Sequence, residues 1–168
     1  MDIPHPEEDD VLVTLDPLEV VEHVLHAERL DFDRTEDGDL AFSLKGDWKD
    51  YELWFAWRPE AECLQLFLSI DMRAAGARAA AETLANLINQ RVWLGHFEIW
   101  TGEGEVVFRH ALPLPSGERP SLAQTASMID AAMEAADRFY PAFDFLIREG
   151  RAPADAMAAC MFETLGQA

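Results

Sequence analysis

A change in hydrophobic periodicity limits the folds available to this chain more than any other feature. Between residues 30 and 72 apolar side chains alternate with polar ones, as at Leu40, Phe42 and Leu44, whereas the segments on either side repeat every three to four residues. Alternation is typical of strands with one buried face, and the longer repeat is typical of amphipathic helices. Turn residues interrupt the alternation at 37–38, 46–47 and 59–60. We therefore predict an antiparallel meander that packs against helices.

The helices that flank this meander carry their own start and stop signals. Asp16 followed by Pro17 is typical of a helix N-terminus, because the carboxylate can cap free N–H groups and proline needs no partner there. An alanine-rich helix is expected over 77–91. A capping box at 121–124 begins a long helix, which we expect to kink or restart at Pro141 because proline lacks the N–H of a helical hydrogen bond.

The remaining elements are two strands and a short helix. Phe97 and Ile99 share one face of the first strand, and the second strand, over 106–112, follows a glycine-containing hairpin at 101–104. A last helix is expected over 153–165. We therefore predict an α+β domain with the order α-β-β-β-β-α-β-β-α-α, in which an antiparallel sheet of five to six strands has flanking helices.

The acidic composition narrows the classes of partner. Thirteen Lys and Arg against 32 Asp and Glu give a formal net charge of −19. This charge repels phosphate backbones and anionic lipids, so we expect no nucleic acid and no membrane partner. The acidic N-terminus lacks the features of a secretory signal, and no apolar stretch approaches the ~20 residues of a membrane helix, which predicts a cytoplasmic protein. We expect an acidic flexible tail over 1–13 and a single domain over 14–168.

The sequence contains only incomplete versions of known metal-binding motifs. Asp33 to Leu40 copies the first eight positions of a calcium loop, but position 12, where a bidentate Glu should stand, is Leu44. We therefore favour a hairpin turn for this segment. Cys63 and Cys160 form no C-x-x-C motif, so we expect no structural zinc and interpret both as small buried side chains.

Histidine clusters leave an enzymatic alternative open. His23 and His26 share the wet face of the first helix with Glu19 and Glu22, and exposed ion pairs are favoured there over a transition-metal site. His96 and His110 lie on neighbouring strands near Glu98, and an aligned register would bring them together. Motifs of hydrolases, metalloproteases or nucleotide-binding proteins do not occur. We expect no cofactor and no catalytic activity.

Aromatic residues on the second face of the sheet are the candidate binding residues. The alternation places Trp48, Trp54 and Phe67 opposite the helix-packed face, together with Ala56 and Cys63. Large aromatic side chains are worth on the order of 2 kcal/mol each when they are buried, so we expect a partner or a second subunit to cover them. The predicted contact residues are Trp48, Trp54, Phe67 and Trp100.

Several segments of the sequence resemble the YbjN-domain family, whose members are described as bacterial sensory-transduction regulators. The resemblance is carried by RVWLGHFEIWTGEGEVVFRHAL at 91–112, FYPAFDF at 139–145, ETLG at 163–166, VTLDPLEVVEHVLHAE at 13–28 and YELWFAW at 51–57. It implies a fold similar to that of class I type III secretion chaperones. It also implies a small acidic protein that forms a homodimer and holds a segment of a protein partner.

These observations lead to two hypotheses about function. The favoured one is a non-catalytic, chaperone-like regulatory domain linked to sensory transduction, which captures an apolar or basic peptide at a sheet edge or in an apolar groove. The alternative is a metal- or ligand-dependent sensor or enzyme that uses the histidine and acid clusters.

Overall fold

The computed structural model describes residues 16–165, and it has the element order that the sequence predicts. The acidic segment 1–13, and with it the expected domain boundary, lies outside the described residues. The helices are α1 (Pro17–Ala27), α2 (Arg78–Asn89), α3 (Leu122–Ile147) and α4 (Pro153–Leu165). The strands are β1 (Phe32–Arg34), β2 (Leu40–Lys45), β3 (Asp50–Arg58), β4 (Cys63–Arg73), β5 (His96–Ile99) and β6 (Glu105–Pro113). Short 3-10 turns occur at Pro59–Ala61, Ala75–Ala77 and Pro115–Gly117.

The six strands form one antiparallel sheet in the order β1-β2-β3-β4-β6-β5. The first four strands form the predicted meander, and the β5–β6 hairpin joins it through β6. A β-bulge interrupts the pairing of β4 with β6 between Ser69 and Arg73, where Asp71 adopts a positive φ of 53°. Bulges of this kind locally increase twist.

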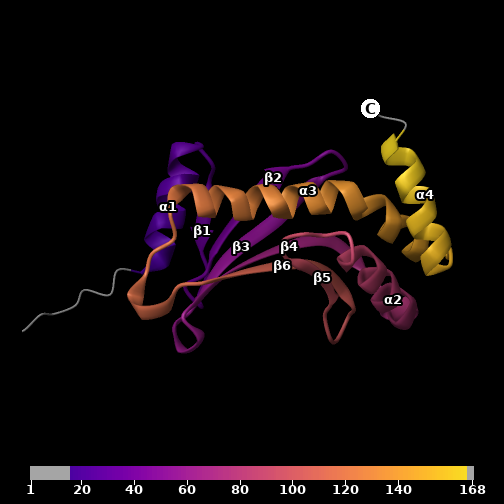
Figure 1. Ribbon diagram of the computed structural model, residues 1–168, viewed down its shortest axis with the longest axis horizontal. Helices are drawn as coiled ribbons and strands as arrows, with labels where there is room; N and C mark the ends of the chain where they lie inside the picture. Colours follow the sequence, from indigo (N-terminus) through magenta and orange to yellow (C-terminus); the bar gives the residue numbers. More distant parts are fainter. Residues whose placement is uncertain (1–15, 166–168) are drawn as a thin grey trace, which may run out of the picture.

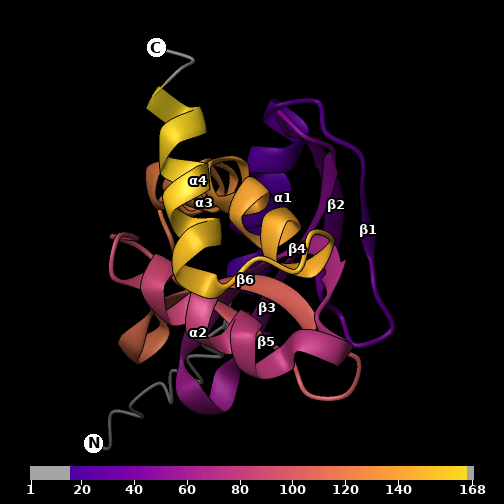
Figure 2. The same ribbon diagram turned by 90° about the vertical axis from the view of Figure 1, so that its right-hand side faces the viewer.

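The four helices supply the packing for one face of the sheet, which we call the covered face. Figure 1 shows α3 lying across the sheet, with α1 toward one end and α2 and α4 toward the other. Figure 2 shows the molecule from that other end, with α4 beside α3 and α2. The predicted inward residues of β2, β3 and β4 lie in the main core with side chains from all four helices. Those with almost no exposed surface include Leu40, Leu53, Phe55, Leu64, Leu66, Leu68 and Ile70.

Hydrogen bonds join the turn between β2 and β3 to α3, one turn of helix before Pro141. The proline cannot donate the hydrogen bond that Asp137 O would accept in a regular helix. This carbonyl accepts instead from the indole Nε1–H of Trp48, at 2.8 Å. The Asp137 carboxylate accepts from the backbone N–H of Asp47 at 2.9 Å and from the Tyr51 hydroxyl at 3.0 Å. The helix therefore does not restart at Pro141, because an indole replaces the missing partner.

Gly46 lies in the same contact, where its backbone comes close to Tyr51 and Asp137. A Cβ atom on this residue would lie 2.2 Å from Cε2 of Tyr51 and 2.6 Å from Oδ1 of Asp137. Burial, and then the hydrogen bond to Asp137, raise the pKa of Tyr51 well above its usual range. Tyr51 therefore stays a neutral hydrogen-bond donor in this contact.

Both edges of the sheet are protected against strand addition. At the β5 edge, Asn89 of α2 accepts from the Phe97 N–H at 2.8 Å and donates to the Phe97 carbonyl at 3.0 Å. This side chain occupies the outward-facing backbone groups of Phe97, which another strand would use. The opposite edge strand, β1, has three residues, of which Asp33 and Arg34 are charged. Short and charged edges resist pairing with another chain.

Candidate binding surface

The second face of the sheet, which we call the open face, carries a small apolar cluster of its own. Its buried members are Ala56, Phe67 and Val107, and Trp54 and Trp100 pack against them. Four of these residues come from the paired strands β3, β4 and β6, and Trp100 directly follows β5. The cluster contains no residue from any of the four described helices. Its outer surface is therefore formed by the aromatic side chains themselves.

Strand register brings the three rings of this cluster together. Trp54 pairs with Phe67 across β3 and β4, and the two rings stack with centroids 5.2 Å apart and an interplanar angle of 10°. Trp100 meets both rings edge-on, at 5.7 Å from Trp54 and 5.8 Å from Phe67. Stacked and edge-to-face pairs add favourable energy beyond the buried area. Phe67 is only 7% exposed, whereas both indoles are half-buried.

Hydrogen bonds hold Trp100 in its place beside the sheet. Its backbone N–H donates to the Glu105 carbonyl at 2.8 Å, and its own carbonyl accepts from Arg78 of α2 at 2.6 Å. The indole Nε1–H donates to the carboxylate of Glu98 at 3.2 Å. Arg109 also donates to Glu98, at 3.4 Å, and its guanidinium lies 5.9 Å from the Phe67 ring centroid. The cluster is thus a fixed surface before any partner arrives.

Acidic groups dominate the margin of the open face. Glu98 lies on β5 beside Trp100, and Glu105 accepts a hydrogen bond from the Ser69 hydroxyl at 2.6 Å. Glu52 pairs with Ser69 across β3 and β4 and is exposed. Arg109 supplies a positive charge, but the ion pair with Glu98 partly neutralises it.

The structure brings together three of the four predicted contact residues. Trp54, Phe67 and Trp100 form the open-face cluster, but Trp48 is not part of it. Trp48 lies in the turn before β3 and stacks on Tyr140 of α3 with ring centroids 6.0 Å apart. The expectation that Trp48 lies on the second face of the sheet was wrong, because the turn ends the strand alternation and directs its indole toward α3, where it is 46% exposed.

The two strand histidines do not form the cluster that an aligned register would produce. His96 pairs with Arg109 rather than with His110, so the two imidazoles lie on opposite faces of the sheet. His110 pairs with Leu66, whose side chain belongs to the covered face. Burial, with a smaller effect from His96, lowers the pKa of His110. His96 lies instead 3.8 Å from Glu98, whose carboxylate also accepts from Trp100 and Arg109, so the two histidines do not share one site.

The acid-rich segments near the N-terminus have structural partners. The calcium-like segment is the β1–β2 hairpin, in which Asp39 pairs with Arg58 at 3.3 Å. On α1, Glu22 pairs with Arg34 at 2.7 Å and Glu19 with Arg119 at 3.1 Å. Within residues 16–165, no group of three or more His, Cys, Asp or Glu side chains is arranged to hold a metal ion. Cys160 is buried as predicted, and Cys63 is half-buried.

One exposed site was missed by the sequence interpretation. The loop after α2 places Trp93 in solvent, with 98% of its surface exposed, beside a groove along α3. The Val-Trp-Leu run at 92–94 was an available signal, because a run of apolar residues in a predicted loop is unusual for a solvated segment.

Comparison with known protein families shows which family this chain belongs to. A family model described as "YbjN: Putative bacterial sensory transduction regulator" matches residues 17–145, which include α1, the whole sheet, α2 and most of α3. The chain belongs to the YbjN family. A comparison with curated proteins finds no match. In the described part of this YbjN-family chain, no helix combines the length and hydropathy that a bilayer crossing needs.

Solved structures with the same fold include the crystal structure of YbjN from E. coli, described as "a putative transcription regulator". It aligns with a TM-score of 0.53 and 10% identity, over 71% of this chain and 85% of the other. A chain of the HopA1-SchA chaperone-effector complex aligns with a TM-score of 0.47 and 11% identity, over 73% of this chain and 97% of the other. A chain of the ExsC-ExsE complex aligns with a TM-score of 0.46 and 22% identity, over 71% of this chain and 90% of the other. The predicted α+β fold of the YbjN domain is confirmed.

Proposed function

We propose that this YbjN-family chain is a non-catalytic regulatory module that binds a segment of another protein on its open face. The observation that carries the proposal is the Trp54, Phe67 and Trp100 cluster on a sheet face to which no described helix contributes. A bound segment would cover the two half-buried indoles with its own apolar side chains. Tryptophan is enriched among the residues that dominate binding energy at protein interfaces.

The fixed geometry of the cluster favours binding. Trp54 and Phe67 are held by stacking, and Trp100 by backbone and indole hydrogen bonds. A surface whose side chains are already ordered loses less conformational entropy when a partner binds. The cluster therefore needs no rearrangement to accept an apolar side chain.

The charges around the cluster indicate the chemistry of the segment. Glu52, Glu98 and Glu105 lie around the rings, the nearby Arg78 and Arg109 are paired with Glu82 and Glu98, and the whole chain carries a net charge of −19. Such a field increases the rate of encounter with basic segments. Because Asn89 occupies one sheet edge and the other edge is short, we propose docking on the face instead of strand addition. The proposed ligand is an aromatic or aliphatic side chain flanked by Lys or Arg.

The test is selection of peptides from a random display library, followed by affinity measurements with matched variants. We expect enrichment of sequences with an apolar residue next to Lys or Arg. Trp54→Ala should weaken their binding by about ten-fold, because it removes half of the stacked pair. Trp48→Ala is the control, since Trp48 is a 46% exposed tryptophan that stacks on Tyr140 of α3, outside the open face. Equal losses in the two variants, or no loss in Trp54→Ala, would contradict the proposal.

A homodimer, a cytoplasmic location and a link to sensory transduction are further parts of this proposal. If two copies pair through the open face, sedimentation of the wild type will show a dimer and Trp54→Ala will show a monomer. A dimer that Trp54→Ala leaves intact would assign pairing to another surface and leave the open face available to a peptide.

A further inference from the structure

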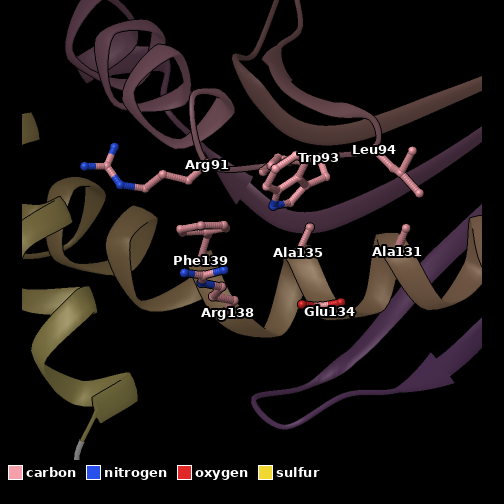
Figure 3. A pocket seen from close by; sticks show the side chains of 9 residues that line it. Arg91, Trp93, Leu94, Ala131, Glu134, Ala135, Arg138 and Phe139 are labelled. Atoms are coloured by element: carbon pink, nitrogen blue, oxygen red, sulfur yellow. The ribbon is translucent and has the colours of Figure 1, made fainter.

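A second surface, separate from the open face, carries positively charged side chains where the margin of the open face is acidic. It is a groove of about 110 Å³ between the loop at 91–94 and α3. Figure 3 shows Trp93 and Leu94 of the loop facing Ala135 and Ala131 of the helix. An enclosed apolar cavity of about 150 Å³ holds benzene, and this groove is smaller but open to solvent, so it can take part of one apolar side chain.

The loop that forms one wall of the groove is anchored at both ends. The Arg91 N–H donates to the Ile88 carbonyl at 2.8 Å, at the end of α2. At the other end, Gly95 has φ of 73°, and a Cβ atom there would lie 2.3 Å from Cζ of Phe108 and 2.7 Å from the Arg109 carbonyl. These constraints fix the two ends of the loop, and between them Trp93 exposes 98% of its surface.

The groove also contains two arginines that lack acidic partners. The chain has 13 Lys and Arg residues, and most of them lie within 4 Å of an Asp or Glu oxygen in the described part. The exceptions are Arg29, Lys45, Arg91 and Arg138. Two of these four therefore line one groove, in a protein with a large excess of acid. Such a coincidence indicates a local site for negative charge.

The guanidinium groups retain free donors. One nitrogen of Arg91 donates to the Leu87 carbonyl at 2.9 Å, and Arg138 lies 5.1 Å from the ring centroid of Phe139. Arginine has five N–H donors and can bind a carboxylate in a bidentate manner. Glu134 also lines the groove, and its single negative charge is outnumbered by the two arginines.

We propose that this groove binds an acidic segment of a partner protein, with one apolar side chain beside Trp93 and carboxylates on Arg91 and Arg138. The charge of the groove is opposite to that of the chain as a whole, and this difference distinguishes its occupant from the basic segment proposed for the open face. At physiological salt, charges beyond about 8 Å are largely screened. The local arginines therefore decide the preference at the groove, despite the net charge of −19.

The test uses three fluorescein-labelled peptides at about 0.15 M salt, where long-range repulsion is screened. Each has a central Leu-Phe pair, which is flanked by aspartates, asparagines or lysines. Anisotropy titrations compare the wild type with Trp93→Ala and with the double variant Arg91→Gln/Arg138→Gln. The matched control is Arg29→Gln/Lys45→Gln, which removes the same charge from the other two unpaired cations. Circular dichroism checks that every variant folds, and Arg91→Gln alone is measured if the double variant does not.

We expect the aspartate peptide to lose about ten-fold or more in affinity in Arg91→Gln/Arg138→Gln, and less than about two-fold in the matched control. Trp93→Ala should weaken both the aspartate and the asparagine peptide. Trp54→Ala should leave the aspartate peptide unaffected, so failure of this proposal can be separated from failure of the open-face proposal. Equal losses in the groove and control variants would overturn the inference. So would a concentration-dependent dimer that Trp93→Ala dissociates, because the groove would then be occupied by a second copy.

Discussion

The two faces of the sheet differ in how their apolar side chains are kept from water. The covered face packs against four helices, and its aromatic residue Phe55 has no exposed surface. On the open face, Phe67 has neighbours from the sheet and from Trp100, and the two indoles form the outer layer. Folding alone therefore removes the apolar side chains of the covered face from water, whereas the open face keeps apolar surface that a partner can bury. The difference separates residues that serve stability from the residues that we propose to serve binding.

The largest effect should come from equal substitutions on the two faces. Phe55→Ala should lower the free energy of unfolding by about 4 kcal/mol, because it leaves a cavity that the packed helices cannot fill. Phe67→Ala should cost about half as much, since water and the neighbouring indoles can occupy the space. Urea unfolding measures both values. Equal costs would show that the open face is a second core of the folded protein.

A second prediction concerns the contact between the β2–β3 turn and α3 on the covered side. Gly46→Ala should destabilise the protein by about 2 kcal/mol, because the new methyl group would overlap Tyr51 and the Asp137 carboxylate. Thermal unfolding measures the loss. The control is Gly38→Ser in the β1–β2 hairpin, where a Cβ meets no neighbour and only the positive φ opposes it. A smaller loss at Gly46 than at Gly38 would contradict the close packing of this turn.

The third prediction concerns the open face alone. Trp54→Ala should lower the free energy of unfolding by about 1 kcal/mol, because its indole is half-buried and gains little from folding of the single chain. Its effect on peptide binding should be proportionally greater. A loss of stability close to that of Phe55→Ala would mean that the indole serves the fold more than a partner.

The smallest effect is a pH dependence from His110, which lies on the covered face. Burial lowers its pKa in the folded state below the unfolded value of about 6.5, so the folded chain binds fewer protons than the unfolded one. Its contribution is full above about pH 6.5 and declines as pH falls through that value toward the lowered pKa. Urea unfolding of the wild type and His110→Gln across this range should show a shallower decline in the variant. Identical slopes would contradict the assignment.

The sequence was sufficient to predict the strands because alternation decides which side chains lie on each face. Leu53 and Phe55 lie in the core, and Trp54 lies on the opposite face, as expected from a period of two. The register of the β3–β4 pair then places Trp54 beside Phe67. The helix order and the capping box of α3 also follow from local signals.

The sequence gives a wrong prediction, or leaves an alternative open, where no hydrophobic repeat extends. Trp48 has the same parity as Trp54, but it lies in a turn, where the alternation has no meaning. The separation of His96 from His110 depends on the register of the β5–β6 hairpin, which local composition does not determine. The groove beside Trp93 depends on how a loop meets a helix distant in sequence.

Five tryptophans make the central claim directly measurable, because each indole N–H gives a separate signal in a ¹⁵N-edited NMR spectrum. Trp54 and Trp100 report on the open face, Trp48 and Trp57 on the covered side, and Trp93 on the groove. The measurement is a titration with the lysine-flanked Leu-Phe peptide. We predict that the Trp54 and Trp100 signals shift while those of Trp48 and Trp57 stay in place. Shifts at Trp48 and Trp57, or at Trp93 alone, would contradict binding on the open face.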